Sequence, residues 1–115
     1  WQTSRGPMLD AGVFVAGLEY AAGVEAEVVG KPSRAYFEAA LAELGASPDE
    51  AVMVGDDVDA DVGGAKALGM RGVLVRTGKF EEKTLAVADP QPDAVIDSIA
   101  DLPALLSRQA VSQSP

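Results

Sequence analysis

Apolar residues along the chain fall into two patterns, short continuous runs and helical spacing. Three runs, AVMV at 51–54, GVLV at 72–75 and a weaker AVI at 94–96, have the length and composition of buried strands. Around them, apolar residues recur at three- and four-residue spacing, which predicts amphipathic helices. Continuous apolar strands that alternate with helices predict an α/β fold with a parallel sheet covered on both faces.

Start and stop residues bound the predicted helices. Asp10 stands in an N-cap position and Gly23 follows the first helix, while Pro32 precedes the second and Gly45 ends it. The predicted helices cover residues 10–22, 33–44, the segment that follows the AVMV strand through about Leu68, and 98–106, where Pro103 restarts the helix. AEVV at 26–29 is a short extended run, and the polar tail from 107 is expected to fray.

Composition narrows the classes of function. The 115 residues suffice for one domain at most, and 18 acidic against 9 basic residues give a net charge of -9, which argues against nucleic acid or an anionic membrane as partner. Cysteine and histidine are absent, which excludes disulfides, Ser-His or Cys-His nucleophiles and most transition-metal sites. The apolar runs are too short for a membrane span or signal peptide, so the cytoplasm is the expected location. The chain begins at Trp1, and we expect a processed chain or a piece of a longer one.

Four aspartates, Asp56, Asp57, Asp59 and Asp61, lie within six positions directly behind the AVMV run. Either Asp57 or Asp59 caps a helix while the others favour its positive end, or the group prepares a cation site. Capping or helix stabilisation explains Asp59 and Asp61 well. It does not explain Asp56, which is too early to cap and lies at the carboxyl end of a strand, where open parallel sheets bind ligands. We therefore predict that Asp56 is a metal ligand.

The donor type indicates the metal. Carboxylate oxygens without imidazole or thiolate favour Mg²⁺, which binds one or two carboxylates and retains several waters. A calcium loop that began at Asp57 would need glycine at its sixth position and glutamate at its twelfth. Val62 and Leu68 occupy those positions, which excludes that alternative.

Lys31 lies in VVGKPS, between an extended run and a proline-started helix, where an ammonium would help to bind an anion. A phosphate-binding P-loop is excluded because Glu25 and Pro32 occupy its glycine and Ser/Thr positions. A solvated surface lysine is the simpler alternative for Lys31 alone. Its position 25 residues before Asp56, each after an apolar run, makes the pair a more specific signal.

The segments VVGKPSRAYFEAAL and AVMVGDDVDADVGGAKALGMRGVLVRTGKF resemble the second half of haloacid dehalogenase (HAD) superfamily phosphatases. The branch that they resemble contains phospholysine phosphohistidine inorganic pyrophosphate phosphatase, and the similarity runs from about Trp1 to Leu106. The resemblance implies a partial Rossmann-like HAD core of three parallel strands over residues 24–107. It also implies that residues 1–23 end the cap module, that 108–115 are a frayed tail, and that the N-terminal half and most of the cap are missing.

Residue roles follow from the same resemblance. Lys31 matches the catalytic, phosphate-stabilising lysine, and Asp56 matches the direct Mg²⁺ ligand. Asp57 matches the second acid, which orients metal-bound water, and Asp61 falls on a further metal-site acid with a less certain role. The implied function is Mg²⁺-dependent hydrolysis of a phosphomonoester, phosphoramide or pyrophosphate, with a small phosphorylated molecule or pyrophosphate as substrate.

The sequence departs from the family pattern in one essential respect. Family members begin their chemistry with an Asp-x-Asp nucleophile on a strand that precedes the lysine motif, and this chain has none there. Asp57-Val-Asp59 has the spacing and Thr77 could supply a hydroxyl, but two residues separate Asp57 from the strand end and Lys31 is on the wrong side in sequence. We therefore expect the chain alone to be inactive, and to self-associate or pair with the missing N-terminal half.

Two other classes of function remain as alternatives. A receiver-like signalling domain also binds Mg²⁺ through an acidic pair and carries a Lys-Pro, but it has these in the reverse order and needs five strands. A non-catalytic half-domain that acts as an interaction module would persist by pairing with another chain. The absence of a sheet neighbour for AVMV is the feature that favours this second alternative.

Overall fold

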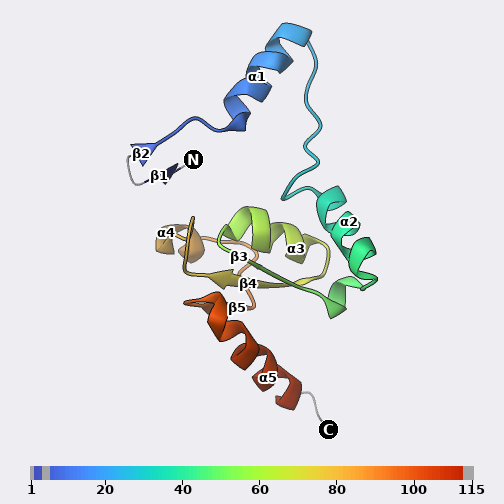
Figure 1. Cartoon of the computed structure of the whole chain (residues 1–115), viewed down its shortest axis with the longest axis vertical. Helices are drawn as coiled ribbons and strands as arrows, with labels where there is room; N and C mark the ends of the chain where they lie inside the picture. Colours follow the sequence, from blue (N-terminus) through green and yellow to red (C-terminus); the bar gives the residue numbers. More distant parts are fainter. Residues whose placement is uncertain (1, 4–5, 113–115) are drawn as a thin grey trace.

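Three parallel strands form the centre of the molecule, and helices lie on both of their faces (Figure 1). The computed structural model describes residues 2–3 and 6–112, with the backbone alone at 2, 3, 7 and 109–112. In chain order the elements are β1 (Gln2–Thr3), β2 (Gly6–Pro7), α1 (Ala11–Ala22), α2 (Arg34–Leu44), β3 (Val52–Gly55), α3 (Gly64–Ala67), β4 (Arg71–Val75), α4 (Glu82–Ala86), β5 (Ala94–Ile96) and α5 (Leu102–Ser112). Short helical turns at Pro48–Glu50, Val58–Gly63 and Ile99–Asp101 precede β3, α3 and α5.

The central sheet has the order β3-β4-β5, and both pairs of strands are parallel. Val73 of β4 sits opposite Val54 of β3 on one side and Ala94 of β5 on the other. The three strands predicted from apolar runs are therefore confirmed, as is the mixed α/β class. Among the described strands, β3 is paired on one side alone, with β4.

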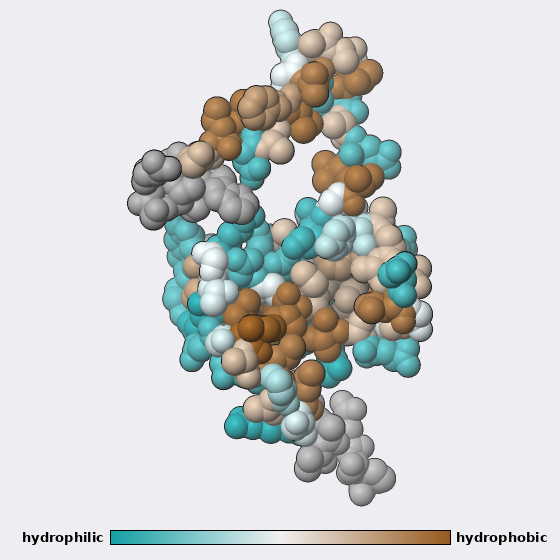
Figure 2. Space-filling model, viewed as in Figure 1, coloured by the Kyte–Doolittle hydropathy of each residue, from teal (hydrophilic) through white to brown (hydrophobic). Residues whose placement is uncertain are grey.

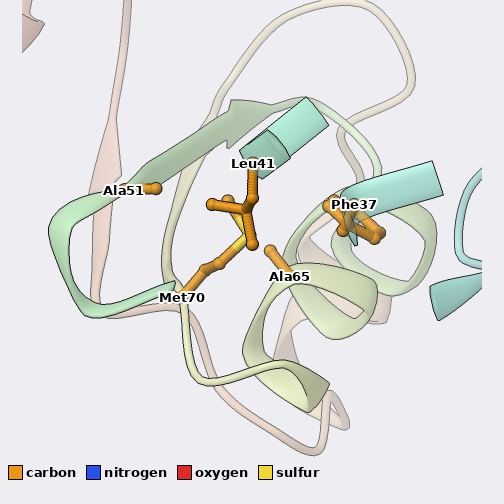
Figure 3. Close-up of a cluster of buried hydrophobic side chains, with 5 residues drawn as sticks. All are labelled: Phe37, Leu41, Ala51, Ala65 and Met70. Atoms are coloured by element: carbon orange, nitrogen blue, oxygen red, sulfur yellow. The ribbon is translucent and has the colours of Figure 1, made fainter. Parts of the chain in front are cut away.

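The two faces of the sheet have separate cores. Leu74 of β4 points to one face, and Val73 and Val75 point to the other. The first face carries two buried clusters, Phe37, Leu41, Ala51, Ala65 and Met70 (Figure 3), and Val58, Val62 and Leu74. The second face carries Val73, Val75 and Ile96, against which Leu102 and Leu105 of α5 pack. Burying a large apolar side chain contributes roughly 1.5–3 kcal/mol, so these clusters hold the helices on the sheet.

The helix predicted after β3 is present but begins in an unusual form. A π-helical turn, Val58–Gly63, leads directly into α3, so the helical segment ends close to the predicted Leu68. Asp57 is its N-cap, and its carboxylate accepts from the backbone N–H groups of Asp59 and Ala60. This segment places its apolar side against β4 and its start at the carboxyl end of β3.

The first helix has the predicted bounds but belongs to none of the buried clusters formed by the described residues. Asp10 caps α1, and Gly23 ends it in the left-handed conformation at φ 67°. None of its residues is buried, and Phe14 and Leu18 of its predicted apolar stripe are 68% and 70% exposed. Figure 1 shows α1 apart from the sheet, and Figure 2 shows apolar surface over it. The AEVV run at 26–29 forms no strand and is exposed.

The C-terminal end differs from the prediction. The restart at Pro103 is confirmed, because a short turn at Ile99–Asp101 leads into α5. The predicted helix end at Leu106 is wrong, and the tail expected to fray from residue 108 is helical through Ser112. Residues 113–115 of that tail, like Trp1, lie outside the described residues. The described helices include none that is long and apolar enough to cross a membrane.

Candidate functional site

The aspartate pair lies where the β3 strand ends, next to the turn that follows β4. One carboxylate oxygen of Asp56, Oδ2, accepts a hydrogen bond of 2.8 Å from the backbone N–H of Lys79. The two strands are parallel neighbours, so their carboxyl ends meet at one edge of the sheet. Asp56 therefore lies at the edge where the sequence places a ligand site.

The two carboxylate oxygens of Asp57 contact different groups, the backbone of the helical segment and Lys79. Oδ1 accepts from the backbone N–H groups of Asp59 at 3.2 Å and Ala60 at 2.9 Å, which caps the helical segment. Oδ2 faces the ammonium of Lys79 at 3.7 Å. Of the two proposed capping residues, Asp57 is the cap, and it still turns one oxygen away from the helix.

Asp61 is almost completely buried, with 2% of the residue exposed. Its Oδ1 accepts from the Lys31 ammonium at 2.5 Å, and its Oδ2 accepts from the backbone N–H of Asp57 at 3.1 Å. Gly55 makes room for this arrangement, since a Cβ there would overlap the Asp61 carboxylate. Both oxygens are engaged within the protein, so the geometry favours a positioning role for Asp61, and its suggested role as a metal ligand stays a prediction.

Lys31 is held by this buried acid. The hydrogen bond from its ammonium to Asp61 raises the pKa of Lys31 above 10.5, against an opposing effect of partial burial, and Asp56 adds an attractive charge. The ammonium is therefore charged throughout the physiological pH range. About a third of the side chain remains exposed, at 36%, so the group is both fixed and accessible. Lys31 is thus joined to the acidic segment, unlike a solvated surface lysine.

The two leading aspartates line a cavity of about 460 Å³ at this edge of the sheet. Its lining consists of Asp10, Asp56, Asp57, Val58, Asp59, Leu74, Gly78, Lys79, Phe80, Glu81 and Thr84. Lys31 and Asp61 do not line it, but Asp61 joins Lys31 to Asp57 by hydrogen bonds. Thr77, considered above as a hydroxyl donor, is also absent from the lining.

The sequence reasoning missed Lys79, which contacts both leading aspartates. The available signal was its position in TGKF, directly behind the GVLV strand and hence at the same sheet edge as Asp56. The Arg76 guanidinium lies 5.0 Å from the centre of the Phe80 ring, and Phe80 packs with the buried cluster of Val58 and Leu74. The turn that carries Lys79 is therefore anchored in the core.

The number of carboxylates at this edge, those of Asp56 and Asp57, is compatible with the coordination of Mg²⁺. Across the described part of the chain, no three acidic side chains converge as a cation site. Mg²⁺ does not require three, since it binds one or two carboxylates and completes its shell with water and phosphate oxygens. Asp56 Oδ1 has no hydrogen-bond partner among the described residues, and the contact of Asp57 Oδ2 among those residues is the Lys79 ammonium, so neither oxygen accepts a hydrogen bond from the backbone there.

Comparison with protein families gives a match over most of the chain. A family model described as HAD-hydrolase-like matches residues 28–102, which contain Lys31 and all four aspartates. The phospholysine phosphohistidine inorganic pyrophosphate phosphatase of Bos taurus is 46% identical over 110 residues, 96% of this chain. That alignment covers 41% of the bovine protein, so the chain spans about two fifths of the length of the curated relatives it matches.

Solved structures give the same result at the level of the fold. The p-nitrophenyl phosphatase from Archaeoglobus fulgidus superposes with a TM-score of 0.78 and 33% identity, covering 91% of this chain and 42% of that one. The glycerol phosphate phosphatase from Mycobacterium tuberculosis, solved in complex with magnesium, superposes with a TM-score of 0.69 and 33% identity, covering 83% of this chain and 29% of that one. The three-stranded sheet is thus a partial HAD core. The match over residues 28–102 and the shared fold show that the chain belongs to the HAD-like hydrolase family.

Proposed function

We propose that this chain supplies the electrostatic half of the active site of a Mg²⁺-dependent HAD phosphatase. The observation that carries the proposal is the connected set at the sheet edge: Lys31 bonded to Asp61, Asp61 bonded to Asp57, and Asp56 beside it. Phosphoryl transfer depends mainly on positioning and on neutralising negative charge. The fixed Lys31 ammonium supplies positive charge, and the two aspartates at the same edge of the sheet would position a Mg²⁺ that supplies more.

Lys31 is the proposed phosphate-binding and catalytic lysine. A free carboxylate nucleophile and a phosphate repel each other, since like charges near 4 Å cost roughly 4 kcal/mol at an effective dielectric of about 20. The Lys31 ammonium offsets this repulsion, and its attraction grows as charge develops on the phosphoryl oxygens. Asp61 holds the ammonium in one place, so little reorganisation is needed when the substrate arrives.

Asp56 and Asp57 are the proposed holders of Mg²⁺. When bound, the ion would neutralise phosphate charge and help to orient the reacting groups. Asp56 contributes Oδ1, while its Oδ2 is kept in place by the Lys79 N–H. Asp57 is fixed by its capping bonds, so its Oδ2 can hold a water of the metal shell in a constant direction. We propose Asp61 as the residue that positions Lys31 and Asp57.

The proposed substrate class is a phosphomonoester, phosphoramide or pyrophosphate. The names of the relatives support this range, since they include a phospholysine and pyrophosphate phosphatase, a p-nitrophenyl phosphatase and a glycerol phosphate phosphatase. The 115-residue sequence contains no Asp-x-Asp ahead of Lys31. We therefore propose that the nucleophile comes from a partner segment and that the chain alone is inactive.

The alternative function is that of an interaction module, and it rests on exposed apolar surface. β3 is paired on one side alone among the described strands, and α1 buries none of its residues. An apolar strand with an open edge is a template for association. We propose that the chain self-associates or pairs with a HAD N-terminal half, which would cover β3 and supply the aspartate together.

The test is complementation in solution. The purified chain should release no phosphate from p-nitrophenyl phosphate or pyrophosphate with Mg²⁺, and light scattering should show a dimer or larger species. Adding the N-terminal half of a close relative should restore Mg²⁺-dependent turnover. Pairing without any turnover would favour the interaction module. Turnover by a monodisperse 115-residue monomer would contradict the proposal that the nucleophile is supplied from outside.

A further inference from the structure

The turn after β4, Thr77–Phe80, is fixed at both of its ends. The backbone N–H of Phe80 donates to the Thr77 carbonyl at 3.0 Å, which closes the turn. Phe80 then packs with the buried Val58 and Leu74 cluster. Arg76 lies against the Phe80 ring and also pairs with acids that follow it in the chain. The turn therefore has a defined position relative to the end of β3.

This turn contacts both leading aspartates through one residue. Lys79 donates its backbone N–H to Asp56 Oδ2 at 2.8 Å, and its ammonium lies 3.7 Å from Asp57 Oδ2. Gly78 allows the approach, because it has φ +54° and a Cβ there would overlap the Asp56 carboxylate. A side chain at position 78 would thus meet both backbone strain and a collision.

We propose that Gly78 and Lys79 are positioning residues of the metal site, acting on its two carboxylates in different ways. The Lys79 backbone N–H holds Asp56 by Oδ2 and leaves Oδ1 for the cation. The Lys79 ammonium neutralises the charge of Asp57 while no cation is present. It must move away from Asp57 Oδ2 when a cation binds. This inference rests on the proposed function, since it assigns roles toward the Mg²⁺ that Asp56 and Asp57 would hold.

The two residues should affect Mg²⁺ affinity in opposite directions. Groups that hydrogen-bond a ligating side chain typically change metal affinity about 10–100-fold when they are lost. Gly78→Ala should displace Asp56 and weaken Mg²⁺ binding within that range. Lys79→Gln keeps the backbone N–H but removes a competing positive charge, so it should strengthen Mg²⁺ binding several-fold.

The experiment is a titration of the full chain with Mg²⁺, followed by the NMR amide shifts of residues 55–61. Two variants serve as matched controls. Gly45→Ala introduces the same left-handed strain at φ +63° in open space, and Lys83→Gln removes the same charge from an exposed residue that pairs with Glu81. Both controls should bind Mg²⁺ as the unmodified chain does.

The outcomes separate this inference from the proposed function. If the unmodified chain shows no Mg²⁺-dependent shifts, the metal part of the proposed function fails and this inference fails with it. If it binds Mg²⁺ but Gly78→Ala and Lys79→Gln match their controls, only this inference is overturned. Should Gly78→Ala not fold, Asp56→Ala provides the second measurement. It should accelerate hydrogen exchange at the Lys79 amide, and an unchanged rate would contradict the positioning bond.

Discussion

The α1 helix and the α2 helix that covers the sheet have equally good capping residues but differ in how much of each is buried. Both α1 and α2 begin at a capping side chain, Asp10 or Ser33, and both end at a glycine in the left-handed conformation. Yet α2 buries Phe37 and Leu41, whereas α1 buries nothing. Local capping sets where a helix starts and stops, while burial requires a partner surface.

The consequence is that the two regions should differ in stability within one chain. An isolated helix shorter than about 12–15 residues is marginal in water. With 12 residues and no buried side chain, α1 lies at that limit, and its exposed apolar stripe is the surface available to a partner. The sheet region carries both the core and the candidate site.

The largest expected effect comes from a matched pair of phenylalanines. Phe37→Ala should lower the free energy of unfolding by about 3–5 kcal/mol, because it empties a core position that is 1% exposed. Phe14→Ala in α1 should change it by less than about 0.5 kcal/mol, since that side chain is 68% exposed. Urea unfolding monitored by circular dichroism measures both. Equal losses would show that α1 is packed in solution.

Catalysis provides the next test of the sheet region. In the complemented enzyme, Lys31→Ala should reduce turnover about 10²–10³-fold, as expected when a charge aimed at the transition state is removed. Lys83→Ala removes the same charge from a side chain that is 81% exposed and should leave turnover unchanged. Steady-state kinetics with p-nitrophenyl phosphate provides the comparison. Near-normal turnover in Lys31→Ala would show that Lys31 is an ordinary surface lysine without a catalytic role.

The buried acid should matter for stability more than its exposed neighbour. Asp61→Ala leaves the Lys31 ammonium and the Asp57 N–H without their acceptor and should cost about 1–3 kcal/mol. Asp59→Ala, in an exposed position of the same turn, should cost less than about 0.5 kcal/mol. Thermal unfolding of the two variants measures the difference. A similar loss in both would assign Asp61 to helix stabilisation alone.

The cap of α1 should have a local effect only. Asp10 accepts from the Ala11 N–H at 2.7 Å, and losing such a cap typically costs a helix about 0.5–2 kcal/mol. Asp10→Ala should therefore speed hydrogen exchange at the amides of α1. The unfolding midpoint of the sheet region should stay the same, because α1 buries no residue against it. A lower midpoint would show that the two regions unfold together.

The smallest expected effect is a pH dependence that arises from Asp93. Burial alone would raise the pKa of Asp93, but the Lys66 ammonium at 2.6 Å and the Gly72 N–H at 2.8 Å outweigh it and lower the pKa below 3.8. The stabilisation is therefore complete above pH 3.8 and disappears as the pH falls through the lowered value. Asp93→Asn should be less stable than the unmodified chain at pH 7, and the two should converge once the pH has fallen below the lowered pKa of Asp93. A constant difference would contradict the charge pairing.

Local features of the sequence were enough to predict the elements. The three apolar runs became β3, β4 and β5, because a strand buried on both faces must be apolar throughout. The helix bounds at Asp10, Gly23 and Gly45 followed from capping, which depends on a few neighbouring residues. Asp56 could be placed at the carboxyl edge because it directly follows a strand.

Only the tertiary structure decided which side chains meet. Lys31 and Asp61 are 30 residues apart, and their pairing depends on how the loop before α2 passes the start of the helical segment after β3. The same holds for Lys79, which follows β4 and donates to Asp56 at the end of the neighbouring strand β3. Likewise, the apolar stripes of α1 and α2 look alike in sequence, but of the two it is α2 whose Phe37 and Leu41 join a buried cluster against which Met53 of β3 packs. Capping and strand burial act over a few residues, so the sequence determined the elements, whereas contacts between distant segments arise from packing and were decided by the fold.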